Sequence, residues 1–166
     1  DEGAEGAAAV KDLNALCKAL ESNPTWTISD TLNRPVLKDN HEDDGSEQHP
    51  YRISTATQLK NFRDLVNGAN NQTADTDAHA KLMNNINLSS VCGESNSWIP
   101  IGTSEEKAYI GTFDGNGHII SGLYIAGDDD DQGLFGYVSG TVQNLSVSGS
   151  VSGNNYVGGV VGDNSG

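Results

Sequence analysis

The residues best suited to chemistry in this sequence are four consecutive aspartates between two glycines, at positions 127–133. Calcium takes oxygen ligands, so Asp128, Asp130 and Asp131 are candidate metal ligands. The spacing differs from that of an EF-hand loop, which places ligands at positions 1, 3 and 5 and a glutamate at position 12. Because adjacent side chains point in different directions, a solvated acidic loop is the simpler interpretation. We therefore expect no cofactor, with calcium as the alternative.

Paired carboxylates would suit a glycoside hydrolase, and Asp114 with Asp131 is one such combination in this sequence. Asp114 lies in Phe113-Asp114-Gly115-Asn116-Gly117, where a short side chain that bonds the turn backbone is expected. A polysaccharide lyase normally uses cationic side chains to stabilise its developing anion, and neither Lys nor Arg occurs after Lys107. We therefore predict no catalytic residues, and a carbohydrate-active enzyme is the alternative.

The histidines and cysteines do not form a recognisable metal or redox motif. The segment 41–44 begins like the zinc motif H-E-x-x-H, but Gly45 occupies the place of the second histidine and cannot bind zinc. Cys17 and Cys92 would form a disulfide in an exported protein if the segments that carry them lie together. Burial of Cys17 as a small apolar residue explains it equally well, so no disulfide is predicted.

The charge of the chain excludes two classes of partner. The chain has 166 residues, of which 9 are Lys or Arg and 23 are Asp or Glu, for a formal net charge of -14. A nucleic-acid or anionic-membrane surface would need basic side chains to neutralise phosphates. No apolar stretch approaches the roughly 20 residues of a spanning helix. We expect neither nucleic-acid binding nor membrane insertion.

Two amphipathic helices are predicted near the amino end. The first has apolar residues at helical spacing and ends before Pro24, and its stripe is Val10, Leu13, Leu16, Cys17 and Leu20. The second begins at the capping box Thr55-Ala56-Thr57-Gln58 and ends at Asn67-Gly68. Its apolar stripe is Leu59, Phe62, Leu65 and Val66.

The carboxyl-terminal third contains internal repeats. It holds 14 of the 20 glycines, and no helix is expected there. Three segments, 82–88, 119–125 and 141–147, have apolar residues at their second, fifth and seventh positions and Asn or Gly at the fourth. A second unit, Gly133-Leu134-Phe135-Gly136, returns after 26 residues as Gly159-Val160-Val161-Gly162. The spacings of 22 and 26 residues predict one coil per repeat of a right-handed parallel β-helix, with an antiparallel sandwich as the alternative.

The repeat pattern assigns inward and outward positions. Leu123, Ile125, Leu145 and Val147 should line the interior, and the fourth-place Asn or Gly should adopt left-handed backbone angles. Tyr124 lies between two inward residues and should face outward. It is the best single candidate for ligand contact.

Several motifs, in order, resemble those of the GLUG-motif proteins, which are exported bacterial surface proteins with glycine-rich repeats. They are Trp98-Ile99-Pro100-Ile101-Gly102, then 111–123, then Gly133-Leu134-Phe135-Gly136, and then Val157-Gly158-Gly159-Val160-Val161-Gly162. The segment 53–67 also resembles the lead-in to such repeats. The resemblance covers residues 51–166 and implies a β-helical stalk or adhesin-like module outside the cell. It brings no catalytic residues.

The resulting organisation has three zones within a mainly β protein that carries two helices near its amino end. Residues 1–50 form a helix and an acidic loop that cap the solenoid, residues 51–108 a helix and the first coil, and residues 109–166 the glycine-rich repeats. A solenoid end exposes strand edges and apolar interior. We therefore expect further repeats, or another chain, to cover the carboxyl-terminal end.

We expect an extracellular or cell-surface module, adhesin-like or structural, that binds a host or matrix protein or glycan through its faces without catalysis. The first alternative is the carbohydrate-active enzyme. The second is a calcium-stiffened surface spacer.

Overall fold

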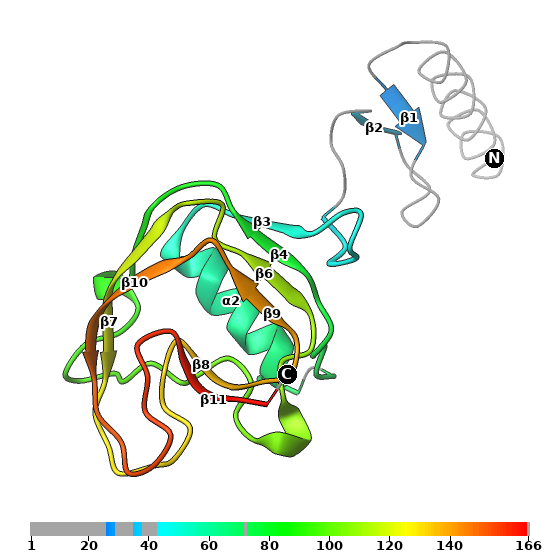
Figure 1. The fold of residues 1–166 in the computed structure, drawn as a ribbon. Helices are drawn as coiled ribbons and strands as arrows, with labels where there is room; N and C mark the ends of the chain where they lie inside the picture. Colours follow the sequence, from blue (N-terminus) through cyan, green and yellow to red (C-terminus); the bar gives the residue numbers. More distant parts are fainter. Residues whose placement is uncertain (1–25, 29–34, 38–42, 72, 166) are drawn as a thin grey trace, which may run out of the picture. The chain divides into compact units, whose positions relative to one another are not determined.

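The chain divides into two units, residues 1–42 and 43–166. The computed structural model describes residues 26–28, 35–37, 43–71 and 73–165 (Figure 1). In the first unit, strand β1 (Trp26–Ile28) pairs antiparallel with β2 (Pro35–Leu37). The expected first helix, with Cys17, and the segment His41-Glu42 lie outside the described residues.

Helix α2 (Ala56–Asn67) confirms the prediction from the capping box. The Gln58 backbone N–H donates to Thr55 Oγ1 at 3.2 Å, and the Thr55 N–H donates to Gln58 Oε1 at 3.1 Å. These two bonds satisfy backbone donors that a helix start leaves unpaired. Gly68 ends the helix in the left-handed conformation with φ of 68°, and its N–H donates to the Leu65 carbonyl.

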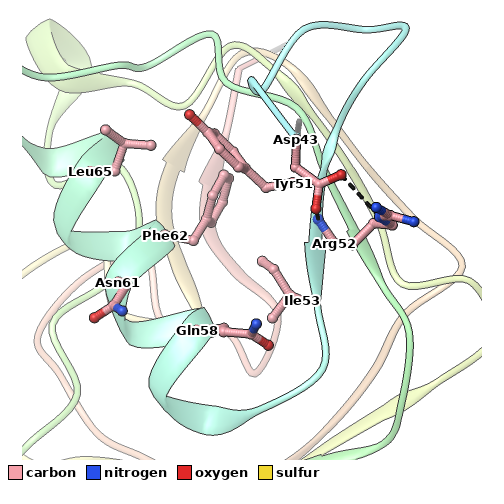
Figure 2. A pocket seen from close by; sticks show the side chains of 8 residues that line it. All are labelled: Asp43, Tyr51, Arg52, Ile53, Gln58, Asn61, Phe62 and Leu65. Atoms are coloured by element: carbon pink, nitrogen blue, oxygen red, sulfur yellow. Dashed lines mark hydrogen bonds and ion pairs between the residues drawn. The ribbon is translucent and has the colours of Figure 1, made fainter. Parts of the chain in front are cut away.

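Helix α2 buries one face, through Leu59, Phe62 and Val66. Its flank beside strand β3 (Tyr51–Ile53) leaves a cleft whose lining side chains are drawn in Figure 2. The buried face shows why a 12-residue helix is stable here, since a helix of this length needs tertiary packing in water.

Eight strands follow α2, and every pairing among the strands of the second unit is parallel. The sheets have the orders β3-β4-β6-β9, β5-β7-β10 and β8-β11. Two short 3₁₀ helices, η1 (Leu88–Ser90) and η2 (Glu105–Lys107), lie in the connections. The strands are β4 (Ala80–Leu82), β5 (Ile86–Asn87), β6 (Thr112–Asp114), β7 (Ile119–Ile125), β8 (Phe135–Val138), β9 (Thr141–Gln143), β10 (Ser146–Val151) and β11 (Val161–Asn164).

The chain passes through the three sheets in the same order each time. It forms β4 and β5 and then a parallel bridge from Ile101 to Phe135 of the third sheet. It next forms β6, β7 and β8, and then β9, β10 and β11. In Figure 1, the first sheet lies to the right of the unit, β7 and β10 lie to the left, and β8 and β11 lie below. Within the sheets of the second unit, the parallel pairings exclude the antiparallel alternative.

The register corrects one part of the repeat alignment. Phe135 lies opposite Val161, 26 positions later, as the sequence predicts. The 22-residue spacing was wrong, because Leu123 lies opposite Gly149 and not opposite Leu145. An apolar pattern of period two is unchanged by an even slip, so it cannot fix the register alone. A register shift between Val147 and Gly149 changes the phase further.

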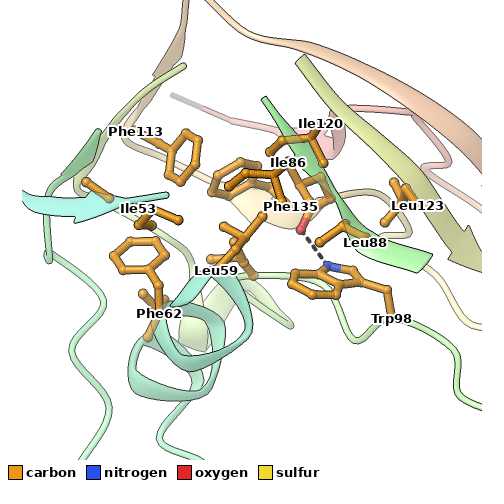
Figure 3. Close-up of a cluster of buried hydrophobic side chains, with 14 of the residues drawn as sticks. Ile53, Leu59, Phe62, Ile86, Leu88, Trp98, Phe113, Ile120, Leu123 and Phe135 are labelled. Carbon is orange, nitrogen blue, oxygen red and sulfur yellow. Dashed lines mark hydrogen bonds between the residues drawn. The ribbon is translucent and has the colours of Figure 1, made fainter. Parts of the chain in front are cut away.

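The interior contains stacked apolar side chains (Figure 3). Phe113 lies between Ala80 and Val142 of the neighbouring strands. Its ring centroid is 5.1 Å from that of Phe135 and 5.9 Å from that of Phe62. Aromatic pairs at such distances stabilise a core beyond the area that they bury. The helix and the first and third sheets therefore share one aromatic cluster.

The predicted interior residues divide according to the strand that carries them. Leu123 and Ile125 of β7 are buried, as predicted. Leu145, just before β10, and Val147, within it, are only partly buried and pack against the core. Strand β10 lies at the outer edge of its sheet, so its side chains have a neighbouring strand on one side only.

The fourth-place residues follow the prediction in two of the three repeats. Gly122 and Asn144 have φ of 70° and 53°. Asn85 does not have a positive φ, and its Oδ1 instead accepts a hydrogen bond from the Ile119 N–H at 3.0 Å. Gly122 lies inside β7 and changes the side-chain alternation, so that both Ile120 and Leu123 face the core.

A partly buried charge cluster on α2 gives a pH-dependent prediction. Burial of Asp64 opposes its ionisation, but hydrogen bonds from Lys60 (2.7 Å) and Arg63 Nε (2.9 Å) outweigh burial and lower the pKa of its carboxyl. A lowered folded-state pKa stabilises the fold above the unfolded-state value of about 3.9, and the contribution is lost as pH falls through the folded-state pKa.

We expect Asp64→Asn to lower the free energy of unfolding by about 1–3 kcal/mol at neutral pH, because the two cations lose their anion. Urea titrations at neutral pH and at about pH 2.5, below the unfolded-state pKa, measure the effect. The difference from wild type should shrink at the lower pH, and Asp128→Asn, at an exposed position, is the control. An equal loss at both pH values contradicts the charge-based account.

Candidate functional site

The described residues include a surface groove of about 490 Å³ between two connections. One wall is the segment Ser97–Thr103, which follows η1, and the other is the loop 126–132 between β7 and β8. Two hydrogen bonds position the walls: the Ala126 N–H donates to Ser97 Oγ at 3.2 Å, and the Trp98 N–H donates to the Tyr124 carbonyl at 2.8 Å. The groove is therefore attached directly to the second sheet.

The centre of the first wall is apolar, with Trp98, Ile99 and Pro100 between the polar Ser97 and Thr103. Trp98 is buried, and its indole Nε1–H donates to the Leu134 carbonyl at 3.1 Å. The Arg63 guanidinium lies 4.7 Å from the centroid of the Trp98 ring, a distance that favours a cation–π contact. Ile99, the next residue, is 54% exposed. The structure thus presents an apolar side chain on a rigid support.

The second wall is acidic. Asp129, Asp130 and Asp131 line the groove, whereas Asp128 is exposed and is not part of the lining. Burial raises the pKa of the Asp131 carboxyl, and the neighbouring charges of Asp163 and Asp130 raise it further. The groove as a whole combines an apolar wall with a negative one.

Asp130 has a structural role through its side chain. Its Oδ1 accepts hydrogen bonds from the Asn155 N–H at 2.9 Å, from Asn155 Nδ2 at 3.0 Å and from Asn154 Nδ2 at 3.0 Å. These bonds join the acidic loop to the loop 152–156 of the following repeat. Within the described part of the chain, no group of three or more His, Cys, Asp or Glu side chains could hold a metal ion.

Tyr124 lies beside the groove and not in it. It is half-buried on β7, where Ser150 is its strand partner, and its side chain packs against the core. Its carbonyl accepts the hydrogen bond that positions Trp98. The candidate ligand residue therefore contributes to the groove through its backbone carbonyl and is not among the lining residues.

Asp114 ends strand β6, and its side chain bonds the backbone of the turn that follows, as the sequence predicted. Its Oδ1 accepts hydrogen bonds from the Asn116 N–H at 2.8 Å and from Asn144 Nδ2 at 3.0 Å, and Lys81 Nζ lies 3.5 Å from Oδ2. The Asn144 hydrogen bond is the main cause of its lowered pKa. A general acid needs the opposite shift, so this environment suits a structural carboxylate.

Sequence reasoning missed a second acidic cleft, of about 360 Å³, lined in part by Asp75, Asp77 and His79. Burial raises the pKa of the Asp75 carboxyl, and a hydrogen bond to Asp77 and the charge of Asp77 add to the shift. The spacing Asp75-Thr76-Asp77 is the only local signal, and it lies in a polar stretch that reads as an ordinary loop.

Cys92 is a buried free thiol, 3.4 Å from the Gly122 carbonyl oxygen. Its possible partner Cys17 lies outside the described residues. Cys92 behaves here as a small apolar residue at the junction of η1 and β7.

No helix in the described part of the chain is long and apolar enough to cross a membrane.

Comparisons with known proteins give two relatives of low identity. The chain is 31% identical to a halomucin of Haloquadratum walsbyi over an alignment that covers 71% of this chain and 2% of that protein. It is 32% identical to a putative Gly-rich membrane protein of Evansella cellulosilytica, over 68% of this chain and 14% of that protein. No family model and no solved structure matches. The chain thus spans a small part of each relative, and both names indicate surface or membrane association of those relatives.

Proposed function

We propose that the second unit is a short right-handed parallel β-helix and that it serves as a non-catalytic, surface-associated display module. The observation that carries the proposal is the repeated order in which the chain visits three parallel sheets. A solenoid stacks equivalent side chains on neighbouring coils, and the pairs Ile86–Ile120, Ile120–Val147 and Phe135–Val161 have that relation. The proposal includes membership of the GLUG-motif group.

Surface association is supported by the two relatives, a halomucin and a Gly-rich membrane protein. It is also consistent with the net charge of -14, which keeps a displayed module soluble and apart from anionic polymers. We place the module outside the cell. A protein exposed there would be labelled by antibodies on intact source cells, whereas labelling only after lysis contradicts this location.

The outer strands of the sheets support a role in a longer array. Strands β9, β10 and β11 each stand at the end of a sheet order, and the partly buried Val142, Val147 and Val161 lie on them. An unpaired edge with apolar neighbours is a site for further strand pairing. We propose that further repeats or another chain cover this face.

The groove between Ser97–Thr103 and the loop 126–132 is the contact surface of the proposed module. A host or matrix protein, or a glycan, would cover Ile99, and basic groups on it would meet the acidic wall. Charge complementarity of this kind speeds association and selects partners.

We expect Ile99→Ser to weaken binding to a matrix component by about tenfold, which corresponds to the loss of roughly 1.4 kcal/mol of apolar contact. An array of matrix proteins and glycans identifies the component, and titration of the purified chain measures affinity. Ile110→Ser is the matched control, because Ile110 is 53% exposed and lies away from the groove. The proposal fails if no array component binds, or if both variants bind as wild type does.

A further inference from the structure

The cleft between helix α2 and strand β3 has the features of a small ligand site (Figure 2). Its volume is about 270 Å³. Gln58, Asn61, Phe62 and Leu65 are spaced along one helical face, and Tyr51 and Ile53 share one face of the strand. The cleft shares no lining residue with the groove described above.

The floor of the cleft is apolar and rigid. Phe62 and Ile53 are buried, and Leu65 and Tyr51 are partly buried. The Tyr51 and Phe62 rings pack edge to face, with centroids 6.2 Å apart. Gly45, with φ of 80°, packs so closely that a Cβ there would lie 2.5 Å from Tyr51 Cε2. The Tyr51 ring is therefore held in place before any ligand arrives.

The rim of the cleft carries two amide side chains. Gln58 Oε1 accepts the Ser54 and Thr55 backbone N–H groups, which fixes the orientation of this amide. Among the hydrogen bonds of the described residues, none uses Gln58 Nε2 or the Asn61 side chain. The rim thus offers amide donors and an amide acceptor to a ligand.

The two charged residues that line the cleft, Asp43 and Arg52, pair with each other. Asp43 Oδ1 accepts a hydrogen bond from Arg52 Nε at 2.9 Å, and Asp43 Oδ2 accepts the Arg52 backbone N–H at 3.1 Å. The pair contributes no net charge, in contrast to the acidic wall of the groove. A charged ligand would gain little here, because each rim charge already has a partner.

We propose that this cleft binds one neutral sugar ring in the pyranose form. The C–H face of such a ring packs on aromatic and aliphatic side chains, and its hydroxyls are both donors and acceptors that match the amides of Gln58 and Asn61. The volume lies slightly below the range of about 300–1,000 Å³ found for drug-sized ligands, so it fits one ring. The site depends only on the geometry of α2 and β3 and goes beyond the display function.

The test is an NMR titration of the full chain with methyl glycosides of glucose, galactose and mannose. At least one should shift the side-chain amide signals of Gln58 and Asn61 saturably, with a dissociation constant on the order of millimolar. Asn61→Ala should weaken that binding about fivefold or more, because it removes a neutral hydrogen bond. Thr57→Ala, at an exposed position of the same helix outside the cleft, should leave it unchanged.

Three results would overturn the proposal. The first is the absence of saturable shifts with all three glycosides. The second is equal binding by wild type and Asn61→Ala. The third is tighter binding of cyclohexylmethanol than of any glycoside, which would make the cleft a socket for an apolar side chain. Asn61 is exposed and alanine favours helix, so the variant should fold, and its amide spectrum confirms that independently.

Discussion

Replacing Phe113 with alanine is expected to lower the free energy of unfolding by about 3–5 kcal/mol. Phe113 is 0% exposed, and its ring meets Phe62 of α2 and Phe135 of β8. The substitution leaves a cavity at the place where the helix and two of the sheets come together. A loss of this size is a large part of the 5–15 kcal/mol that stabilises a typical domain.

Chemical denaturation followed by circular dichroism measures the effect of Phe113→Ala. Ile119→Ala is the control, because Ile119 is an exposed aliphatic residue at the start of β7 and should cost less than about 1 kcal/mol. The slope of the transition should be similar for both variants if unfolding stays two-state. A loss below about 1 kcal/mol for Phe113→Ala would mean that the aromatic cluster is not the centre of the core.

The second large effect is expected at Gly140, where alanine should cost about 2–3 kcal/mol. A Cβ on Gly140 would overlap the carbonyl oxygen of Gly111 and would lie 2.5 Å from the Ile110 carbonyl carbon. Gly111 in turn approaches the Ala78 backbone in the same way. The backbone segments that carry these glycines lie side by side, and the Thr141 N–H donates to the Gly111 carbonyl at 2.9 Å. A side chain at Gly140 would force these neighbouring backbone segments apart.

Gly159→Ala is the matched control for Gly140→Ala. Gly159 lies in the same glycine-rich segment and does not have a positive φ. A Cβ at this position would meet no atom within 4 Å. Thermal unfolding of the two variants should therefore give a lower midpoint for Gly140→Ala only. Equal midpoints would show that the glycines serve chain flexibility and not close contact between neighbouring backbone segments.

The second helix could be predicted because its signals are local. Thr55 and Gln58, three positions apart, form the capping box. Gly68 ends the helix in the left-handed conformation, which other residues adopt only at an energetic cost. The strand-rich character of the tail was equally visible, because glycine and asparagine interrupt short β-branched runs. The described part of residues 109–166 contains no helix, as predicted.

The strand register could not be predicted from the same signals. It depends on contacts such as Ile120 with Val147, which lie 27 positions apart, and on the register shift after Val147. The change of side-chain alternation at Gly122 also could not be predicted from the apolar pattern. The pattern shows which residues are apolar, but it does not show which backbone angles a glycine adopts.

The candidate site was predictable only in part, for a related reason. The acidic run is conspicuous in the sequence. Trp98 and Ile99 lie across the groove from it only because the chain comes back to the same place about 30 residues later. Asp130 illustrates the limit well. The sequence made it a metal candidate, and only the structure shows that its Oδ1 accepts hydrogen bonds from Asn154 and Asn155 of the following repeat.

The most direct test of the account is the measurement of nuclear Overhauser contacts between β6 and β9. We predict contacts between backbone protons of Phe113 and Val142 in a parallel arrangement, with the flanking pairs Thr112–Thr141 and Asp114–Gln143 in the same register. Strong contacts between opposing Hα protons are typical of antiparallel strands. Such contacts between Thr112 and Gln143 would contradict the stacked parallel coils on which the proposed function rests.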